Sequence, residues 1–367
     1  MGQSRKSILA TLFTPAAVCA TLAACGGGDN SEPPPPPPSG PAPNCASLLS
    51  GTYRVIEPTF GAASQSKTIT IDAPALQVTD QGSVDTIVPN GECRYTDTSS
   101  DVVVSSAGVI VARSFNDDLQ QQRVAIAFPE QTMSVADIAG TWNMLGANLV
   151  SGSSASSALY TGMSGTLTLS STGQVSGNFC EHIKTCAPFA DAITVSSNPS
   201  GGFDVVNAAD GSTEHLFAYR APASGDVMLV DVADDGSIAV FTKQHTNSVS
   251  TVGAKSASWG TWMNTSYAST AGVSESSFTT TANDAAAGTW TRESDGDGHV
   301  ETLYANSPRD GYTHRSEGTA ATTAGGTVPV REFTALNLVG MGVSVLWLPS
   351  LGQPSAPGAL FFSVVKP

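Results

Sequence analysis

The chain has 367 residues, of which 31 are acidic and 16 are basic, and its formal net charge is −15 at pH 7. A surface this acidic repels the phosphate backbone of DNA or RNA, so nucleic acid is excluded as a partner. Anionic lipid head groups are repelled as well, so contact with a membrane needs something other than a basic patch.

The first 24 residues carry the pattern of an export signal. Arg5 and Lys6 precede an apolar run, residues 8–24, which Pro15 interrupts. The run is too short and too irregular for a membrane-spanning helix. It ends in the box Leu22-Ala-Ala-Cys25. We therefore predict a signal peptide over residues 1–24.

The basic start, the apolar run and the box together resemble the signal of bacterial lipoproteins. In that family the box cysteine is acylated, with palmitate among the added chains, and becomes the mature N-terminus. The resemblance implies that Cys25 carries the lipid, and two or more buried acyl chains anchor a protein stably. Because Gly26 and not Asp follows the cysteine, it also implies the outer membrane, with the periplasmic or cell-surface face left open. An ordinary secretory signal with an incidental cysteine is the alternative.

Residues 25–43 form a candidate tether. An unbroken proline run, Pro33–Pro38, is preceded by Gly26–Gly28 and followed by Pro41 and Pro43. Polyproline II geometry rises about 3.1 Å per residue, so this stretch is suited to hold a folded body away from the bilayer. Recognition by a proline-binding module is the alternative.

Four cysteines remain once Cys19 has left with the signal and Cys25 is acylated. An even number in an exported protein predicts two disulfide bonds, for which three connectivities exist. The local connectivity is the simplest. It joins Cys45 to Cys93 and Cys180 to Cys186.

Beyond residue 44 the chain is rich in Gly, Ser and Thr, with short apolar runs between turn residues, which is typical of an all-β fold. Turn sequences such as Ser171-Thr-Gly173 and Asp234-Asp-Gly236 predict hairpins. No amphipathic helix longer than a turn or two is expected. We predict antiparallel, hairpin-built sheets that form barrel-like or sandwich units. Representative strands are 123–128, 166–169, 227–230 and 237–241.

A weak internal repeat divides this part into three. The triplets Gly51-Thr-Tyr53, Gly140-Thr-Trp142 and Gly260-Thr-Trp262 each follow a short polar-then-apolar lead, and an apolar strand closes each block. The spacing is too uneven for a solenoid but suits related β-units with loop insertions. We predict β-units at residues 44–133, 134–256 and 257–367, with closing strands at 123–128, 237–242 and 358–365.

Each lead is expected to form a capped turn over one end of a sheet, after which the glycine lets the backbone pass close. The leads are residues 44–49, 134–139 and 255–259. The aromatic residue that follows would fill the core. Contact with a ligand is the alternative. The predicted core aromatics are Tyr53, Trp142, Trp262 and Trp290.

The Gly-x-Trp opening also resembles that of lipocalins and other calycin barrels, in which this Trp closes one end of a ligand-holding barrel. The match is the three-residue triplet of each block, and Arg220, after Phe217-Ala-Tyr219, could play the part of the family's late arginine. The family's Thr-Asp-Tyr-type segment has no counterpart here. The resemblance implies a closed or half-closed antiparallel barrel and leaves a small apolar ligand as a hypothesis.

The segment Ser294-Asp-Gly-Asp-Gly-His299 with Glu301 places oxygen and nitrogen ligands at alternate positions, a partial calcium-loop pattern. The last ligand of such a loop should be Glu, and here that position is Asn306. A solvated hairpin turn is the simpler interpretation, and no other cofactor is predicted. The weak metal candidates are Asp295, Asp297, His299 and Glu301.

Catalytic signatures are weak. Gly162-Met-Ser-Gly165 lacks the spacing of a nucleophile elbow. We predict a non-enzymatic, membrane-anchored envelope lipoprotein with a structural or binding role. One alternative is a calycin-like barrel that holds a small apolar ligand in an apolar cavity. The other is an exported hydrolase, in which a histidine would meet Ser or a carboxylate in a cleft. The histidines are His182, His215, His245, His299 and His314.

Overall fold

The computed structural model describes residues 45–58, 66–96, 100–116, 121–150, 159–262, 273–323, 325–349 and 358–367. Their regular elements are all strands, paired antiparallel and mostly between neighbours in sequence. The predicted fold class is therefore confirmed. The signal peptide, Cys25 and the tether lie outside the described residues. Within the described part of the chain, no helix has the length and hydropathy needed to cross a membrane.

The first unit is a nine-stranded sheet in the order β4-β3-β2-β1-β9-β8-β7-β6-β5. Alternation sets its faces, because in β2 Ile69 and Ile71 are buried while Thr68 and Thr70 are exposed. The strands are β1 Gly51–Ile56, β2 Ser66–Asp72, β3 Gln77–Asp80, β4 Ser83–Thr86, β5 Val88–Pro89, β6 Arg94–Thr96, β7 Ser100–Val104, β8 Ile110–Asn116 and β9 Gln121–Pro129.

The second unit is a barrel. Its strands follow the order β11-β10-β18-β17-β16-β15-β14-β12-β13, and an additional pairing of β11 with β12 returns the sheet on itself. The strands are β10 Gly140–Leu149, β11 Tyr160–Leu169, β12 Gln174–Glu181, β13 Thr185–Pro188, β14 Ile193–Ser197, β15 Phe203–Asn207, β16 Thr213–Arg220, β17 Val227–Val232 and β18 Ile238–Lys243.

The third unit is a closed barrel in the order β19-β20-β21-β22-β23-β26-β27-β28, and β24 and β25 form a separate two-stranded sheet. The strands are β19 Lys255–Trp262, β20 Ser274–Asp284, β21 Thr289–Ser294, β22 Val300–Ala305, β23 Tyr312–Arg315, β24 Gly318–Ala321, β25 Thr327–Val330, β26 Phe333–Leu338, β27 Val343–Leu348 and β28 Ala359–Val365.

Each unit brings its first strand beside its last. β1 pairs with β9, β10 with β18, and β19 with β28. The chain therefore enters and leaves each unit at neighbouring strands. This shared connectivity gives a physical reason for the sequence repeat of an opening triplet and a closing apolar strand. The third barrel begins at Lys255, two residues before the predicted range 257–367.

In the first two units the aromatic residue ties its lead in place. Tyr53 Oη donates to the carbonyl four residues back at 3.0 Å, and Trp142 Nε1 does the same at 3.0 Å. Both rings are fully buried. The second lead is a capped turn, because Ser134 Oγ donates to the Asp137 carboxylate at 2.6 Å. These contacts give the predicted core aromatics Tyr53 and Trp142 the expected place.

The third unit departs from this pattern. Its lead belongs to strand β19, and the triplet Gly260-Thr-Trp262 ends that strand, so the predicted capped turn is wrong here. Gly260 is required for space, because a Cβ there would lie 1.8 Å from the ring of Phe361. The predicted core residues Trp262 and Trp290 are only half-buried. The strand register instead buries Trp259 and Trp347.

Both expected disulfides are formed. Cys45 is bonded to Cys93, which fastens the first lead to the turn before β6, and Cys180 is bonded to Cys186, which links β12 to β13. The local connectivity is thus the one that the fold uses.

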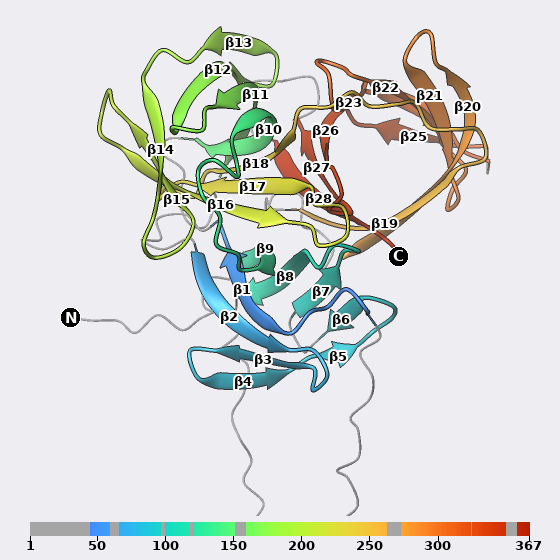
Figure 1. Cartoon of the computed structure of the whole chain (residues 1–367). Helices are drawn as coiled ribbons and strands as arrows, with labels where there is room; N and C mark the ends of the chain where they lie inside the picture. Colours follow the sequence, from blue (N-terminus) through green and yellow to red (C-terminus); the bar gives the residue numbers. More distant parts are fainter. Residues whose placement is uncertain are drawn as a thin grey trace, which may run out of the picture.

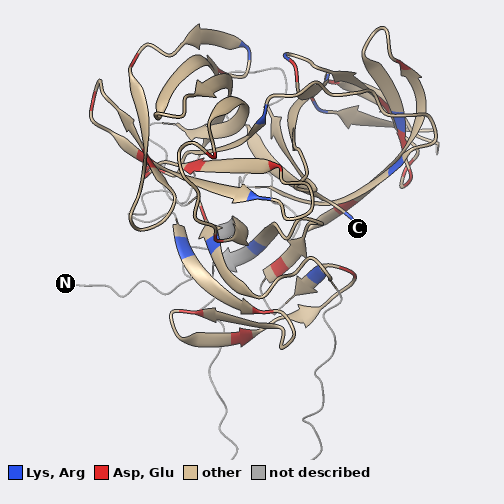
Figure 2. Ribbon diagram, in the orientation of Figure 1, with Lys and Arg blue, Asp and Glu red and all other residues tan. Residues whose placement is uncertain are grey.

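The three units share one hydrophobic core, since a single apolar cluster contains residues of all three. Buried tyrosines join them: Tyr219 Oη donates to Ala107 O at 2.5 Å, and Tyr312 Oη donates to Met144 O at 2.6 Å. Figure 1 shows the second and third units side by side above the first. Acidic positions are spread over the ribbons of all three units (Figure 2), in keeping with the negative net charge.

Candidate ligand cavity in the second barrel

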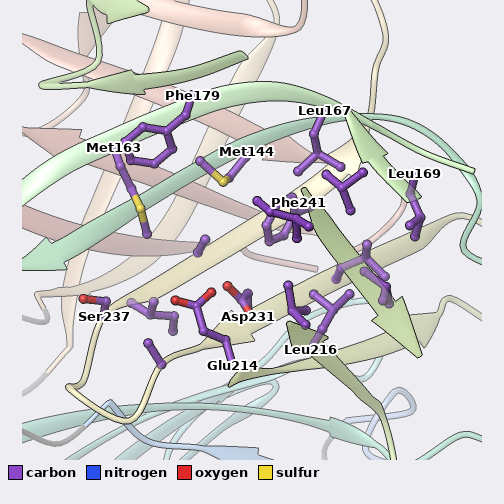
Figure 3. A pocket seen from close by; sticks show the side chains of 18 of the residues that line it. Met144, Met163, Leu167, Leu169, Phe179, Glu214, Leu216, Asp231, Ser237 and Phe241 are labelled. Atoms are coloured by element: carbon purple, nitrogen blue, oxygen red, sulfur yellow. The ribbon is translucent and has the colours of Figure 1, made fainter. Parts of the chain in front are cut away.

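The interior of the second barrel contains a cavity of about 280 Å³. Its wall is mainly apolar and is built by β10, β11, β12 and β14 to β18 (Figure 3). An apolar cavity of about 150 Å³ binds benzene, so this one has room for a molecule of about a dozen non-hydrogen atoms. An apolar hollow with a few convergent polar groups is the usual form of a small-molecule site.

Alternation on β16 and β17 gives the barrel wall two apolar faces. Leu216 and Leu229 line the cavity, whereas Tyr219 and Val230 point outward into the core shared with the other units. Both faces are therefore apolar, and β17 begins with the continuous run Val227-Met-Leu-Val230. Such a run predicts a strand buried on both faces, but it does not distinguish a filled interior from a hollow one.

Trp142 lies near the start of β10, two residues before the cavity-lining Met144. Trp142 and Met144 belong to an apolar cluster of the second barrel that is separate from the core shared by the three units. Lys243 Nζ stands 4.1 Å from the Trp142 ring centroid, and burial lowers the pKa of this lysine. The calycin resemblance assigned a late-arginine role to Arg220. That side chain is exposed and donates to Gly225 O instead. In this barrel the cation on the Trp is therefore Lys243.

Two carboxyl groups, Glu214 of β16 and Asp231 of β17, lie at one side of the cavity (Figure 3). The register pairs Leu216 with Asp231, so Glu214 lies diagonally across on the same face. Asp231 lies beside the Glu214 carboxyl group (Figure 3). Its Oδ1 atom is buried and has no hydrogen-bond partner among the described residues. Burial, and then the neighbouring Glu214 carboxyl, raise the pKa of Asp231 well above its usual range.

The rest of the wall offers this pair no positive charge. Among the described residues that line the cavity there is no Lys, Arg or His. Asn148 and Ser237 supply the other polar groups, and Ser237 Oγ accepts from Leu149 N at 3.0 Å. Two ionised carboxylates without a cation are unfavourable in an apolar hollow, which favours the protonated form of Asp231.

A second hollow of about 250 Å³ adjoins the cavity and shares Phe189, Ile193, Val205 and Glu214 with it. Its wall adds the polar residues Asp191, Asn207 and Ser212. Glu214 therefore faces both hollows. The acid side of the cavity is the side that borders the more polar hollow.

The third barrel also contains a hollow, of about 320 Å³, with many Ser and Thr residues in its wall. Arg292, which lines it, forms an ion pair with Glu301 at 2.5 Å, and Arg315 pairs with the other oxygen of Glu301. The Glu301 side chain is fully buried. The prediction of Glu301 as a calcium ligand is therefore wrong, because two guanidinium groups already neutralise it.

The other calcium candidates are also engaged by neighbouring side chains. Asp297 lies 2.5 Å from His299 Nδ1, and Thr279 Oγ1 donates to Asp295 at 2.9 Å. Hydrogen bonds from His299 and Ser294 lower the pKa of Asp297 to about 2. No group of three or more His, Cys, Asp or Glu side chains in the described ranges is arranged to hold a metal ion. These contacts agree with the simpler interpretation of the segment as a hairpin turn.

The histidines do not gather at a cavity. His215 lies 3.3 Å from Asp204, His299 lies beside Asp297, and His314 lies 3.9 Å from Glu332. None of the chain's histidines lines any of the three hollows described above. These hollows give no support to the hydrolase alternative, which stays an untested prediction.

Sequence reasoning missed Glu214 and Asp231. Neither belongs to a motif, and the carboxylate pairs that stand out in the sequence are neighbours in turns. One signal was available: Asp231 is the single charged residue of the otherwise apolar strand Val227–Val232. A lone acid at such a position is either buried with a partner or placed at a site.

No family model matches the chain, and no curated protein matches it. Among solved structures, it is similar to a DUF3598-family protein of unknown function from Nostoc punctiforme, with 9% identity, 64% of this chain and 99% of the other covered, and a TM-score of 0.20. It is also similar to Transferrin Binding Protein B from Haemophilus parasuis, with 9% identity and a TM-score of 0.17. That match covers 86% of this chain and 74% of the other. Scores this low do not establish a shared fold, and neither likeness supports a function for this chain.

Proposed function

We propose that this chain is a lipid-anchored protein of the bacterial outer envelope that binds a small, mainly apolar molecule inside its second barrel. The binding role rests on the apolar cavity of about 280 Å³. Protein interiors are close-packed, and voids larger than a water molecule are few in a domain. A barrel with a purely structural role would gain stability by filling such a space, since each methyl-sized void costs on the order of 1 kcal/mol.

The test uses the mature chain, residues 25–367, with Cys25→Ser so that no acyl chain or detergent competes for the cavity. The probe is 4-phenylbutan-1-ol, an uncharged molecule of about a dozen non-hydrogen atoms. Calorimetric titration should give one site with a Kd on the order of ten to a hundred micromolar.

A filling variant locates the site. Ala239 is buried and its side chain lines the cavity, so Ala239→Leu places three more carbons into the space and should weaken binding about tenfold or more. Ala223→Leu makes the same change at an exposed position and should leave the Kd unchanged. Absence of binding to the parent, or equal binding by the Ala239→Leu variant, would show that the cavity is not a ligand site.

The envelope part of the proposal is supported by the lipoprotein-like signal and is tested separately. Cys25→Ser in the full-length chain removes the sulfur to which acyl chains are attached. The parent should then pellet with membranes and the variant should not. Equal pelleting of the two would refute the lipid anchor without bearing on the cavity.

A further inference from the structure

We propose that the cavity selects an apolar molecule that carries a primary ammonium group, which docks against Glu214 and Asp231. This inference rests on the proposed binding role and adds the chemistry of the head group. Glu214 and Asp231 are the acidic residues among the described residues that line the cavity.

The acid pair is incomplete as it stands. Glu214 and Asp231 share one face of adjacent strands, and Asp231 Oδ1 is a buried acceptor with no hydrogen-bond donor among the described residues. A buried acceptor without a donor is destabilising, and a hydrogen-bond donor on a ligand would satisfy it. Since no basic side chain among the described residues lines the cavity, the donor and the positive charge would both come from the ligand.

The charge of the ligand's polar group then sets the expected order of affinities. The two acidic side chains have no basic partner in the cavity wall, and an ammonium group supplies a positive charge and donates up to three hydrogen bonds. A hydroxyl group donates one hydrogen bond and supplies no positive charge. A carboxylate would bring a third acid into the same hollow and needs a further proton to enter. Affinity should therefore fall in the order amine, alcohol, carboxylate.

The cavity wall opposite Glu214 and Asp231 is apolar and suits the apolar part of the ligand. Figure 3 shows Met144, Met163 and Phe179 across the cavity from Glu214 and Asp231. Methionine side chains are flexible and polarisable, and they adapt to aromatic rings of different shape. The ligand class that fits both sides is thus an aryl-alkyl or alkyl amine with its nitrogen at the acid side.

The experiment compares 4-phenylbutylamine, 4-phenylbutan-1-ol and 4-phenylbutanoate on the mature chain with Cys25→Ser near pH 7. The amine should bind at least about tenfold more tightly than the alcohol, and the alcohol more tightly than the carboxylate. In the double variant Asp231→Asn and Glu214→Gln, the advantage of the amine over the alcohol should disappear while the alcohol still binds.

A matched control separates the pair from the general acidity of the protein. Asp210→Asn with Glu317→Gln removes the same two charges at exposed positions and should keep the order of the three ligands. If the double variant Asp231→Asn and Glu214→Gln does not fold, the test rests on the single variant Asp231→Asn and on the order of the three ligand affinities in the parent. Equal affinities for all three ligands in the parent would overturn the inference and leave the binding role intact. Absence of binding by all three would overturn both.

Discussion

Replacement of Glu301 on β22 should lower the stability of the protein for a reason that follows directly from the structure. Its buried carboxylate lies between Arg292 and Arg315. Both guanidinium groups are also held over rings, with Arg292 3.9 Å from the Phe278 centroid and Arg315 4.4 Å from the Phe333 centroid. The arginines are therefore held close to Glu301 by two kinds of contact. Glu301→Gln leaves two positive charges near each other with no anion between them.

The expected loss follows from burial. Removing one partner of a buried ion pair costs about 3–5 kcal/mol. The side chains of Arg292 and Arg315 are 22% and 15% exposed, so water offsets part of the repulsion and the lower end, about 3 kcal/mol, is expected. Burial alone would raise the pKa of Glu301, but the two arginines outweigh it and hold that pKa below its usual value. This stabilisation is present above the unfolded pKa of about 4.3 and is lost as pH falls through the lower folded value.

Urea unfolding of residues 25–367, followed by tryptophan fluorescence near neutral pH, measures the loss. Glu317→Gln, at an exposed position, is the control and should stay within about 0.5 kcal/mol of the parent. A midpoint for Glu301→Gln equal to that of the control would refute the ion-pair account. A rise of the parent's midpoint in millimolar calcium, absent in Glu301→Gln, would restore the calcium interpretation.

Three further outcomes are expected from urea unfolding. Tyr312→Phe removes hydrogen bonds to two strand carbonyls of the second unit and should cost about 1–3 kcal/mol. Gly162→Ala places a Cβ 2.5 Å from the Trp347 ring and should cost about 1–3 kcal/mol, with partial recovery when Trp347→Phe is added. Replacing Cys45 and Cys93 together by Ala opens a loop with a sequence separation of 48 and should cost about 4 kcal/mol on the chain-entropy model. For each of the three variants, a urea midpoint equal to that of the parent would contradict the contact on which the prediction rests.

The all-β class and the disulfide pairing could be predicted because both depend on short-range features. Turn residues between apolar runs specify hairpins, and Cys180 and Cys186 are close enough in sequence to meet across β12 and β13. The repeat of Gly-Thr-aromatic triplets likewise reflects a local contact, since Tyr53 and Trp142 each bond back to a carbonyl four residues earlier.

Predictions failed where the decisive contact joins distant segments. Glu301 looks like a metal ligand beside Asp297, but Arg315 reaches it from β23. Trp262 looks like a core residue because it repeats Trp142, but the pairing of β19 with β28 sets Phe361 against the glycine of that triplet and leaves Trp262 half-buried. Neither partner could be identified from the spacing of residues along the chain.

By itself, the sequence determined the strand-and-turn pattern, the acidic surface and the local cross-links, because these follow from composition and from residues a few positions apart. Only the tertiary structure decided that the second barrel is hollow and that Glu214 and Asp231 meet inside it. Alternation tells which residues share a face of one strand. Whether the space enclosed by eight such faces is filled depends on how all their side chains pack together, which no single stretch of sequence specifies.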